Sequence, residues 1–237
     1  MSDITAVILA GGRGERLQPV LPNIPKVLAP VLGRPYLTHL MDRLDCEGIR
    51  DVVLCTGYGA GQIMDHIGKS YRTMTLSYSE ESRPLGTAGA LKHALPLIKS
   101  GRALVLNGDS YFSGTIDKFF RWSVDQDHPL SMMLYFSDET KRFGWVSMNS
   151  EGRITRFHEK DSDSGSGWIN AGIYSIKKDI IAAIPEGECI SLEQCIIPSL
   201  IDTGIYGFPC EGQFIDIGTP ASYAMADYFF KDIHHGH

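Results

Sequence analysis

Two basic and two acidic side chains stand where they could act on a phosphate. Arg16 and Lys26 lie in and just beyond a glycine-rich segment that follows the apolar run 6–10. Asp109 and Asp216 each follow a short apolar run. Phosphoryl transfer depends mainly on positioning and charge neutralisation, and carboxylates are suitable ligands for Mg²⁺. These four side chains are therefore the candidate catalytic residues, with the two aspartates as candidate Mg²⁺ ligands.

The glycine-rich segment has the character of a polyphosphate-binding loop. Glycines allow backbone N–H groups to approach a ligand closely and to form an anion-binding nest. The segment lacks the P-loop pattern G-x-x-x-x-G-K-[ST]. The dinucleotide pattern G-x-G-x-x-G fails at Leu17, which argues against a dinucleotide-dependent oxidoreductase. The candidate nucleotide-binding residues here are Leu9, Gly11, Gly12 and Gly14.

The string G-G-R-G-E-R-L at 11–17, followed by Pro25-Lys26, resembles the signature G-G-x-G-x-R-L…P-K of the sugar-1-phosphate nucleotidyltransferases. These enzymes join a sugar phosphate to a nucleoside monophosphate and release pyrophosphate. The resemblance implies that a sugar 1-phosphate oxygen attacks the α-phosphate of a nucleoside triphosphate. Arg16 would then stabilise the departing pyrophosphate, and Lys26 would hold the α-phosphate and the incoming phosphate.

A second segment extends the resemblance on the nucleotide side. The run from Glu81 to Gly89 matches the family's E-x-x-x-L-G-T-A-G, a loop that contacts the base and ribose. Thr87 is expected to be the N-cap of a helix that reaches Ile98, because threonine side chains accept hydrogen bonds from the first turn. The further candidate nucleotide-binding residues are Glu80, Gly86, Thr87, Asn107 and Gly108.

Three segments of the second half resemble the family's sugar-phosphate site. Glu159 and Lys160 match an E-K element in which the lysine pairs with the sugar phosphate and the glutamate accepts sugar hydroxyls, although Asp161 replaces the usual proline. Asn170 begins N-A-G-I-Y, which matches N-A-G-[IV]-Y, and this asparagine binds sugar hydroxyls in the family. Gly144 fits the place where the backbone approaches the sugar. These residues are the candidate sugar-phosphate-binding residues.

Alternating strand and helix patterns would position these side chains. Strands are predicted at 4–10, 51–56, 73–78 and 102–106, with helices at 36–47, 61–67 and 87–98. This order predicts a parallel sheet with helices on both faces, and ligands bind such sheets at the carboxyl ends of the strands. Further strands with short connections are predicted at 130–136, 144–148, 154–158 and 168–176, and helix starts at Ser191 and Thr219.

Pattern and resemblance together predict an α/β fold: a Rossmann-like, GT-A-like three-layer sandwich with a mostly parallel, mixed central sheet and a small antiparallel addition. We expect a single nucleotidyltransferase domain over residues 1–237. Its nucleotide-binding part would span about 1–128 and its sugar-phosphate-binding part about 129–230.

The composition limits the partners. A net charge of −6 over 237 residues argues against nucleic acid, which usually requires a basic face. No apolar stretch approaches membrane-spanning length, so no membrane partner is expected. Five cysteines without a C-x-x-C pair favour a reducing compartment, and the start Met-Ser-Asp lacks a basic leader, so we expect a cytoplasmic protein. The sequence leaves open whether the chain forms a homo-oligomer.

Three further runs indicate the substrates. Runs at 168–174, 191–194 and 214–220 most resemble D-glycero-α-D-manno-heptose 1-phosphate guanylyltransferases, which make GDP-heptose. The resemblance therefore implies GTP and a heptose 1-phosphate as partners, with Mg²⁺ as cofactor. Mannose 1-phosphate guanylyltransferases and MurNAc or glucose 1-phosphate uridylyltransferases remain open, as does a non-catalytic sugar-nucleotide sensor.

Overall fold

The computed structural model describes residues 3–158 and 165–235. The strands of its large sheet are β1 (Thr5–Leu9), β4 (Asp51–Thr56), β5 (Ser70–Tyr71), β6 (Met74–Glu80), β7 (Arg102–Asn107), β9 (Leu130–Ser137), β10 (Trp145–Met148), β11 (Ile154–His158), β12 (Gly167–Lys177) and β13 (Ile205–Pro209). Two short ladders pair β2 (Pro30–Val31) with β3 (Arg34–Pro35) and β8 (Ser110–Phe112) with β14 (Phe214–Asp216).

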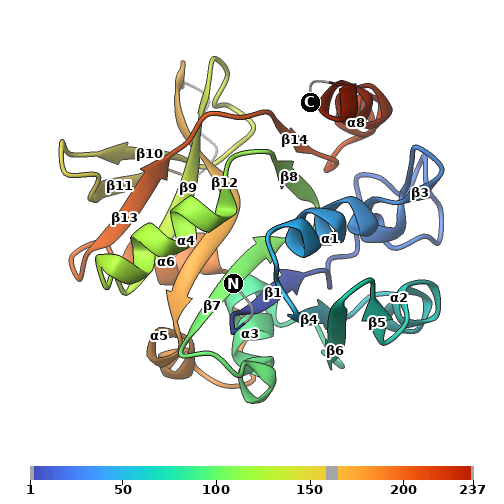
Figure 1. Ribbon diagram of the computed structural model, residues 1–237, viewed down its shortest axis with the longest axis horizontal. Coiled ribbons are helices and arrows are strands. Elements are labelled where there is room, and N and C mark those ends of the chain that lie inside the picture. Colours follow the sequence, from blue (N-terminus) through green and yellow to red (C-terminus); the bar gives the residue numbers. More distant parts are fainter. Residues whose placement is uncertain (1–2, 159–164, 236–237) are drawn as a thin grey trace.

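The helices connect these strands (Figure 1). The α-helices are α1 (Tyr36–Cys46), α2 (Ala60–Ile67), α3 (Gly86–His93), α4 (Ile116–Asp125), α5 (Lys178–Ala183), α6 (Ile197–Ser199), α7 (Pro220–Ala224) and α8 (Ala226–His235). The shorter helical segments are the 3₁₀ turns η1 (Lys26–Leu28) and η2 (Leu95–Leu97) and the π-helical η3 (Leu192–Ile196).

The centre of the sheet is parallel, as the alternating pattern predicts. β1 lies between β4 and β7, so that Val7 is in register with Val53 and Val105. β6 continues the parallel arrangement on the far side of β4. Strands β1, β4 and β7 are buried on both faces, which explains their nearly continuous apolar sequences. Their carboxyl ends meet at one edge of the sheet, and the predicted site loops begin there.

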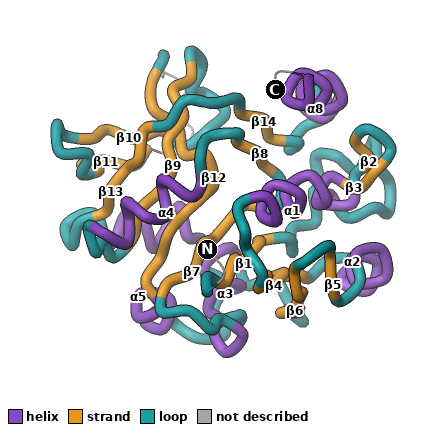
Figure 2. Tube along the Cα trace, in the orientation of Figure 1, coloured by secondary structure: helices purple, strands orange, loops and turns teal. Residues whose placement is uncertain are grey.

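The second half of the chain makes the sheet mixed. β12 is antiparallel to both β7 and β9, and β10 and β11 extend it as an antiparallel pair. β13 returns parallel to β9 at the edge. Figure 2 shows this second group of strands beside the parallel core rather than stacked on it. The topology agrees with the expected mostly parallel sheet and its antiparallel addition.

Two apolar layers cover the sheet. On one face, α1, α2, α4 and α8 pack against inward-facing residues such as Ile8, and the buried aromatics Phe119 and Phe230 belong to this layer. On the other face, α3, α5 and η3 pack against residues such as Val7, with Leu91 among the buried side chains. Figure 1 shows α1 and α4 in front of the sheet. Val7 and Ile8, which are adjacent in β1, thus belong to opposite layers, because successive side chains of a strand point to opposite faces of the sheet.

The predicted N-cap at Thr87 is wrong. α3 begins one residue earlier, and the hydroxyl of Thr87 accepts a hydrogen bond from Leu192 N (2.7 Å) and donates one to Glu193 Oε2 (2.8 Å). The free N–H groups at the start of α3 are instead satisfied by Ile190 O, which accepts from Ala88 N at 2.9 Å. The helix also ends at His93 rather than Ile98. A distant backbone carbonyl replaces the local side-chain cap, and nothing local in the sequence indicates this.

The other two predicted helix starts are confirmed. Ser191 Oγ accepts from Gln194 N at 3.1 Å at the start of η3. Thr219 and Ser222 form a reciprocal capping box, with Pro220 at the first helical position of α7.

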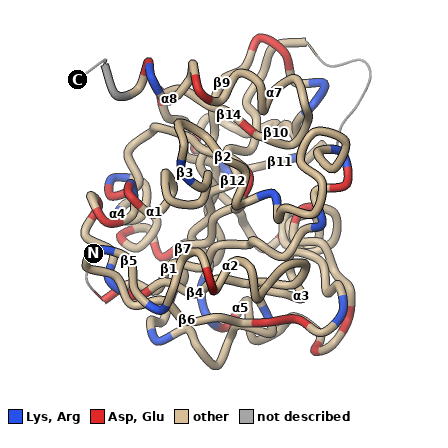
Figure 3. Tube along the Cα trace, turned by 90° about the vertical axis from the view of Figure 1, so that its right-hand side faces the viewer, with Lys and Arg blue, Asp and Glu red and all other residues tan. Residues whose placement is uncertain are grey.

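Charges of both signs are interspersed along the described part of the trace in Figure 3. Over 3–158 and 165–235, none of the helices combines the length and apolar character that a bilayer span needs.

Candidate active site

The ladder of β8 and β14 brings the two candidate aspartates together. Asp216 is in register with Ser110, and Asp109 immediately precedes that serine. The backbone completes the junction, because Ile217 N donates to Asp109 O at 2.9 Å. The ladder therefore holds both carboxylates at the edge where β1 and β7 end.

The two candidate cations lie beside these carboxylates. Lys26 Nζ is 2.6 Å from Asp109 Oδ2, and the lysine side chain is only 10% exposed. A Cβ placed on Gly218 would lie 2.5 Å from Asp216 Oδ2, 3.3 Å from Lys26 Nζ and 3.4 Å from Arg16 NH2. Three predicted catalytic side chains thus converge on the small space that Gly218 leaves open, and Asp109 joins them through its contact with Lys26.

The conformation of the glycine-rich loop explains part of its sequence. Gly14 has φ = +60°, a conformation that favours glycine, and a Cβ there would lie 3.0 Å from Lys26 Cβ. The loop therefore folds closely over the stem of Lys26, which accounts for the burial of that cation.

The carboxylate pair suits a hard divalent cation. Over the described parts of the chain, no group of three or more His, Cys, Asp and Glu side chains could hold a metal ion. Asp109 and Asp216 would therefore share the ion with water and with phosphate oxygens of a substrate. This is the usual way in which proteins bind Mg²⁺, so the residues present fit such an ion.

Two cavities meet at this cluster. The larger, of about 1000 Å³, runs along the glycine-rich loop towards α3, and the smaller, of about 300 Å³, extends towards β10, β11 and η3. Arg16, Asn107 and Asp109 line both. Asn107 Oδ1 is buried there and has no hydrogen-bond partner within the described ranges. The shared residues place one cation, Arg16, and one carboxylate, Asp109, where molecules bound in the two cavities would touch.

Most of the predicted nucleotide-binding residues line the larger cavity. Those that do so are Leu9, Gly11, Gly12, Gly14, Gly86, Thr87 and Asn107. Gly108 is not among its lining residues; its N–H donates to Leu9 O at 2.9 Å, and a Cβ would approach that oxygen to 2.7 Å. Gly108 therefore permits close packing of β1 and β7.

The structure places Glu81, rather than Glu80, in the larger cavity. Glu80 has an exposed side chain at the end of β6, and its carbonyl lies 3.2 Å from His93 Nε2. Glu81 Oε2 accepts from Leu85 N at 3.1 Å. Its Oε1 lies where a Cβ on Gly11 would be only 2.6 Å away. Burial raises the pKa of the Glu81 carboxyl.

The smaller cavity contains the predicted Gly144 and Asn170. Asn170 Nδ2 donates to Tyr174 Oη (2.7 Å), and Tyr174 Oη donates to Glu193 Oε1 (3.0 Å). Burial, and then the Glu193 carboxylate, raise the pKa of the Tyr174 hydroxyl. Glu193 also accepts from Thr87, so one network joins the two cavities. The predicted Glu159 and Lys160 lie outside the described residues.

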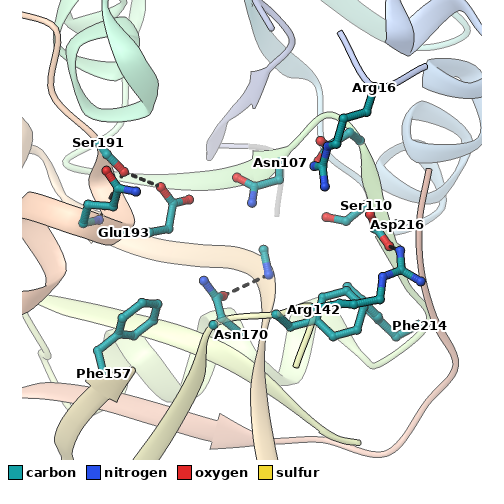
Figure 4. Close-up of a pocket in the computed structure, with 15 residues that line it drawn as sticks. Arg16, Asn107, Ser110, Arg142, Phe157, Asn170, Ser191, Glu193, Phe214 and Asp216 are labelled. Carbon is teal, nitrogen blue, oxygen red and sulfur yellow. Dashed lines mark hydrogen bonds and ion pairs between the residues drawn. The ribbon is translucent and has the colours of Figure 1, made fainter. Parts of the chain in front are cut away.

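Two charged residues of the smaller cavity were not predicted from the sequence. Arg142 NH2 lies 3.0 Å from Asp216 Oδ1 (Figure 4). Glu193 lies across the cavity from it and accepts from Ser191 Oγ at 3.2 Å. Arg142 directly precedes the Phe143-Gly144 segment, and Glu193 lies within the capping motif at Ser191. Both positions could have been found by examining the neighbours of the matched motifs.

This fold and this arrangement of phosphate-binding loop, cations and carboxylates define a nucleotidyltransferase. The Nucleotidyl transferase family pattern matches residues 5–232, and the chain belongs to that family. It is 34% identical over 231 residues to D-glycero-alpha-D-manno-heptose 1-phosphate guanylyltransferase of Aneurinibacillus thermoaerophilus, covering 97% of this chain and 98% of the relative. The resemblance predicted from the motifs is confirmed.

A longer relative is also similar. The chain is 31% identical over 224 residues to Mannose-1-phosphate guanylyltransferase of Mycobacterium tuberculosis, and the match covers 93% of this chain. It spans only 62% of the length of that relative.

Solved structures confirm the fold. HddC from Yersinia pseudotuberculosis complexed with GMP-PN superposes with a TM-score of 0.85 at 33% identity, covering 96% of this chain and 99% of HddC. A putative glucose-1-phosphate thymidylyltransferase from Bacillus anthracis gives a TM-score of 0.87 at 24% identity, a likeness of fold alone.

Proposed function

We propose that this chain transfers a guanylyl group from GTP to D-glycero-α-D-manno-heptose 1-phosphate, giving GDP-heptose and pyrophosphate. The observation that carries the proposal is the meeting of two cavities at Arg16, Asn107 and Asp109. Two bound substrates would present their phosphates to each other at that junction. Such positioning, with charge neutralisation, is most of what phosphoryl-transfer chemistry requires.

The residues at the junction have separate roles. Lys26, held against Asp109 and largely buried, binds the α-phosphate and the attacking phosphate oxygen. Arg16 stabilises the charge that develops on the departing pyrophosphate. A divalent ion, for which Mg²⁺ suits the oxygen donors of Asp109 and Asp216, supplies charge neutralisation at the nucleotide phosphates when bound. An ionised phosphate oxygen attacks, so the step needs no general base.

Glu81 supports guanine as the base. An ionised carboxylate only accepts hydrogen bonds. One oxygen is satisfied by Leu85 N, while the other faces the narrow space between Gly11 and Gly57. Guanine presents two adjacent donors, N1–H and the N2 amino group, whereas uracil flanks its single N3–H with carbonyl oxygens that a carboxylate would repel. A carboxylate in the base end of the larger cavity therefore favours GTP over UTP.

The heptose is supported by the similarity of the relatives. The heptose 1-phosphate guanylyltransferase of A. thermoaerophilus is 34% identical over 231 residues, whereas the mannose 1-phosphate guanylyltransferase of M. tuberculosis is 31% identical over 224. Mannose 1-phosphate is the second candidate, because that relative is still 31% identical over the matched region.

Pyrophosphate release tests the whole proposal. The purified protein is incubated with Mg²⁺, each of the four nucleoside triphosphates, and the 1-phosphates of the heptose, mannose, glucose and MurNAc. Turnover only with GTP and the heptose phosphate is the expected result. Another productive pair would correct the substrates and preserve the reaction, and no turnover in folded protein would favour a non-catalytic sensor.

A pair of neighbouring variants tests the base assignment. Glu81→Gln should lower the kcat/KM ratio of GTP to UTP by about tenfold or more, since a hydrogen bond to a charged group is replaced. Glu80→Gln removes the adjacent, exposed carboxylate and should leave the ratio unchanged. Equal effects of the two substitutions would refute the role of Glu81.

A further inference from the structure

Both candidate metal-binding carboxylates are paired with cations in this structure. Lys26 forms an ion pair with Asp109, and Arg142 forms one with Asp216, at N–O distances of 2.6 and 3.0 Å. The two pairs differ in burial, because the side chain of Lys26 is 10% exposed and that of Arg142 is 43% exposed. Arg142 is therefore the partner with the freedom to leave.

Arg142 contacts the carboxylate oxygen of Asp216 that accepts no backbone hydrogen bond within the described residues. Asp216 Oδ2 accepts from Gly218 N at 3.0 Å, a bond that fixes the carboxylate to the backbone. Oδ1 is left for other partners, and Arg142 NH2 binds there. Binding of a divalent ion at Oδ1 and binding of the guanidinium at Oδ1 therefore compete.

The position of Arg142 also indicates where it can go. Its side chain lines the smaller cavity together with Asn170 and Glu193, and it extends across that cavity from the opposite side to Glu193 (Figure 4). Its guanidinium lies over the ring of Phe143, 5.6 Å from the centroid, and close to Thr219 Oγ1 at 3.5 Å. A guanidinium is a planar, multidentate donor that matches a phosphate group.

We propose that Arg142 binds the phosphate of the incoming sugar 1-phosphate, and that a divalent ion on Asp216 releases it for this role. The assignment of that ligand rests on the proposed function. The exchange makes the two ligands cooperate: the ion frees the guanidinium, and the phosphate bound by the guanidinium leaves Asp216 open to the ion. Thermodynamic linkage requires this coupling to be equal in both directions.

Mn²⁺ binding without substrates tests the competition. Electron paramagnetic resonance measures the affinity of the wild type, of Arg142→Gln and of Arg121→Gln, a control at an exposed arginine on α4. Arg142→Gln should bind Mn²⁺ about two- to fivefold more tightly, the range expected for loss of an exposed ion pair. The gain should vanish when Asp216→Asn is added, which separates competition at this carboxylate from a general change of charge. Unchanged or weaker binding in Arg142→Gln would overturn the exchange.

Isothermal titration calorimetry with the sugar 1-phosphate tests whether Arg142 binds the phosphate of that substrate. Wild type should bind the heptose or mannose phosphate more tightly with Mn²⁺ than without it, and Arg142→Gln should lose this difference. In turnover, Arg142→Gln should raise the KM for the sugar phosphate about tenfold or more, with Arg142→Lys intermediate and the KM for GTP little changed. A rise confined to the KM for GTP would place Arg142 on the nucleotide and overturn the proposal.

The Mn²⁺-binding and sugar-phosphate experiments also distinguish failure of this proposal from failure of the proposed function. If no sugar phosphate supports turnover by the wild type, the proposed function fails, while the Mn²⁺ measurement still decides the competition at Asp216. Circular dichroism and thermal melting of each variant show that the fold is retained.

Discussion

Substitution of Gly218 by alanine tests whether the four catalytic candidates act at one point. The new methyl would lie 2.5 Å from Asp216 Oδ2, and ordinary van der Waals contact begins near 3.4 Å, so the carboxylate must move by about 0.9 Å. A misplacement of about 1 Å in a reacting constellation can lower the rate about hundredfold. Gly218→Ala should therefore lower kcat for pyrophosphate release by about that factor. The backbone of Gly218 has no positive φ, so strain does not contribute.

Gly61→Ala on α2 is the matched control. Apart from the adjacent residues and the backbone of α2 itself, no heavy atom of the described residues lies within 4 Å of a Cβ at that exposed position. It should leave kcat unchanged and raise stability slightly, because alanine favours helix over glycine. Thermal melting of both variants separates misfolding from local displacement. A kcat for Gly218→Ala within threefold of wild type, in folded protein, would refute the convergence of these side chains on Gly218.

Three further predictions concern the carboxylates and the core. Asp109→Asn should abolish detectable pyrophosphate release in protein that circular dichroism shows to be folded, whereas Asp117→Asn in the exposed ion pair on α4 should leave activity intact. Ser175→Ala should lower the free energy of unfolding by about 1–3 kcal/mol in urea denaturation, because Arg102 loses the buried hydroxyl acceptor 3.2 Å from its NH1; retained stability would show that another group replaces it. Since burial raises the pKa of Glu81 and its ionised form is the acceptor, the KM for GTP should rise as the pH falls through that raised value. The rise should be absent in Glu81→Gln, and an identical pH profile in both proteins would contradict the role of the carboxylate.

Local patterns predicted the parts of the fold that depend on local physics. The helix at Tyr36 and the strand at Asp51 follow the predicted residues closely, because apolar periodicity and burial coincide there. The cap of α3 was mispredicted at Thr87, because its real partner is Ile190, about a hundred positions away in the chain. Propensity carries no information about such a contact.

The candidate site, like the fold, was predicted from the sequence only in part. The motif residues Arg16, Lys26, Asp109 and Asp216 come together as the sequence predicts. Arg142 and Glu193 were missed because neither has a distinguishing pattern of its own, although Arg142 lies directly before a matched segment and Glu193 lies within one. Their roles arise only when β10 and η3 are folded beside the ends of β7 and β14. Side chains beside the motifs therefore contribute to the electrostatics of the smaller cavity together with the motif residues themselves.

The ladder between β8 and β14 also has a kinetic consequence. Phe112 and Phe214 are in register although most of the second half of the chain separates them. Closing so long a loop is entropically costly, and contacts of large sequence separation slow folding. The parallel core, in contrast, is complete by β7. During synthesis and during refolding, the chain would then acquire its parallel core well before its paired carboxylates, and the capacity for chemistry would be the last property to appear.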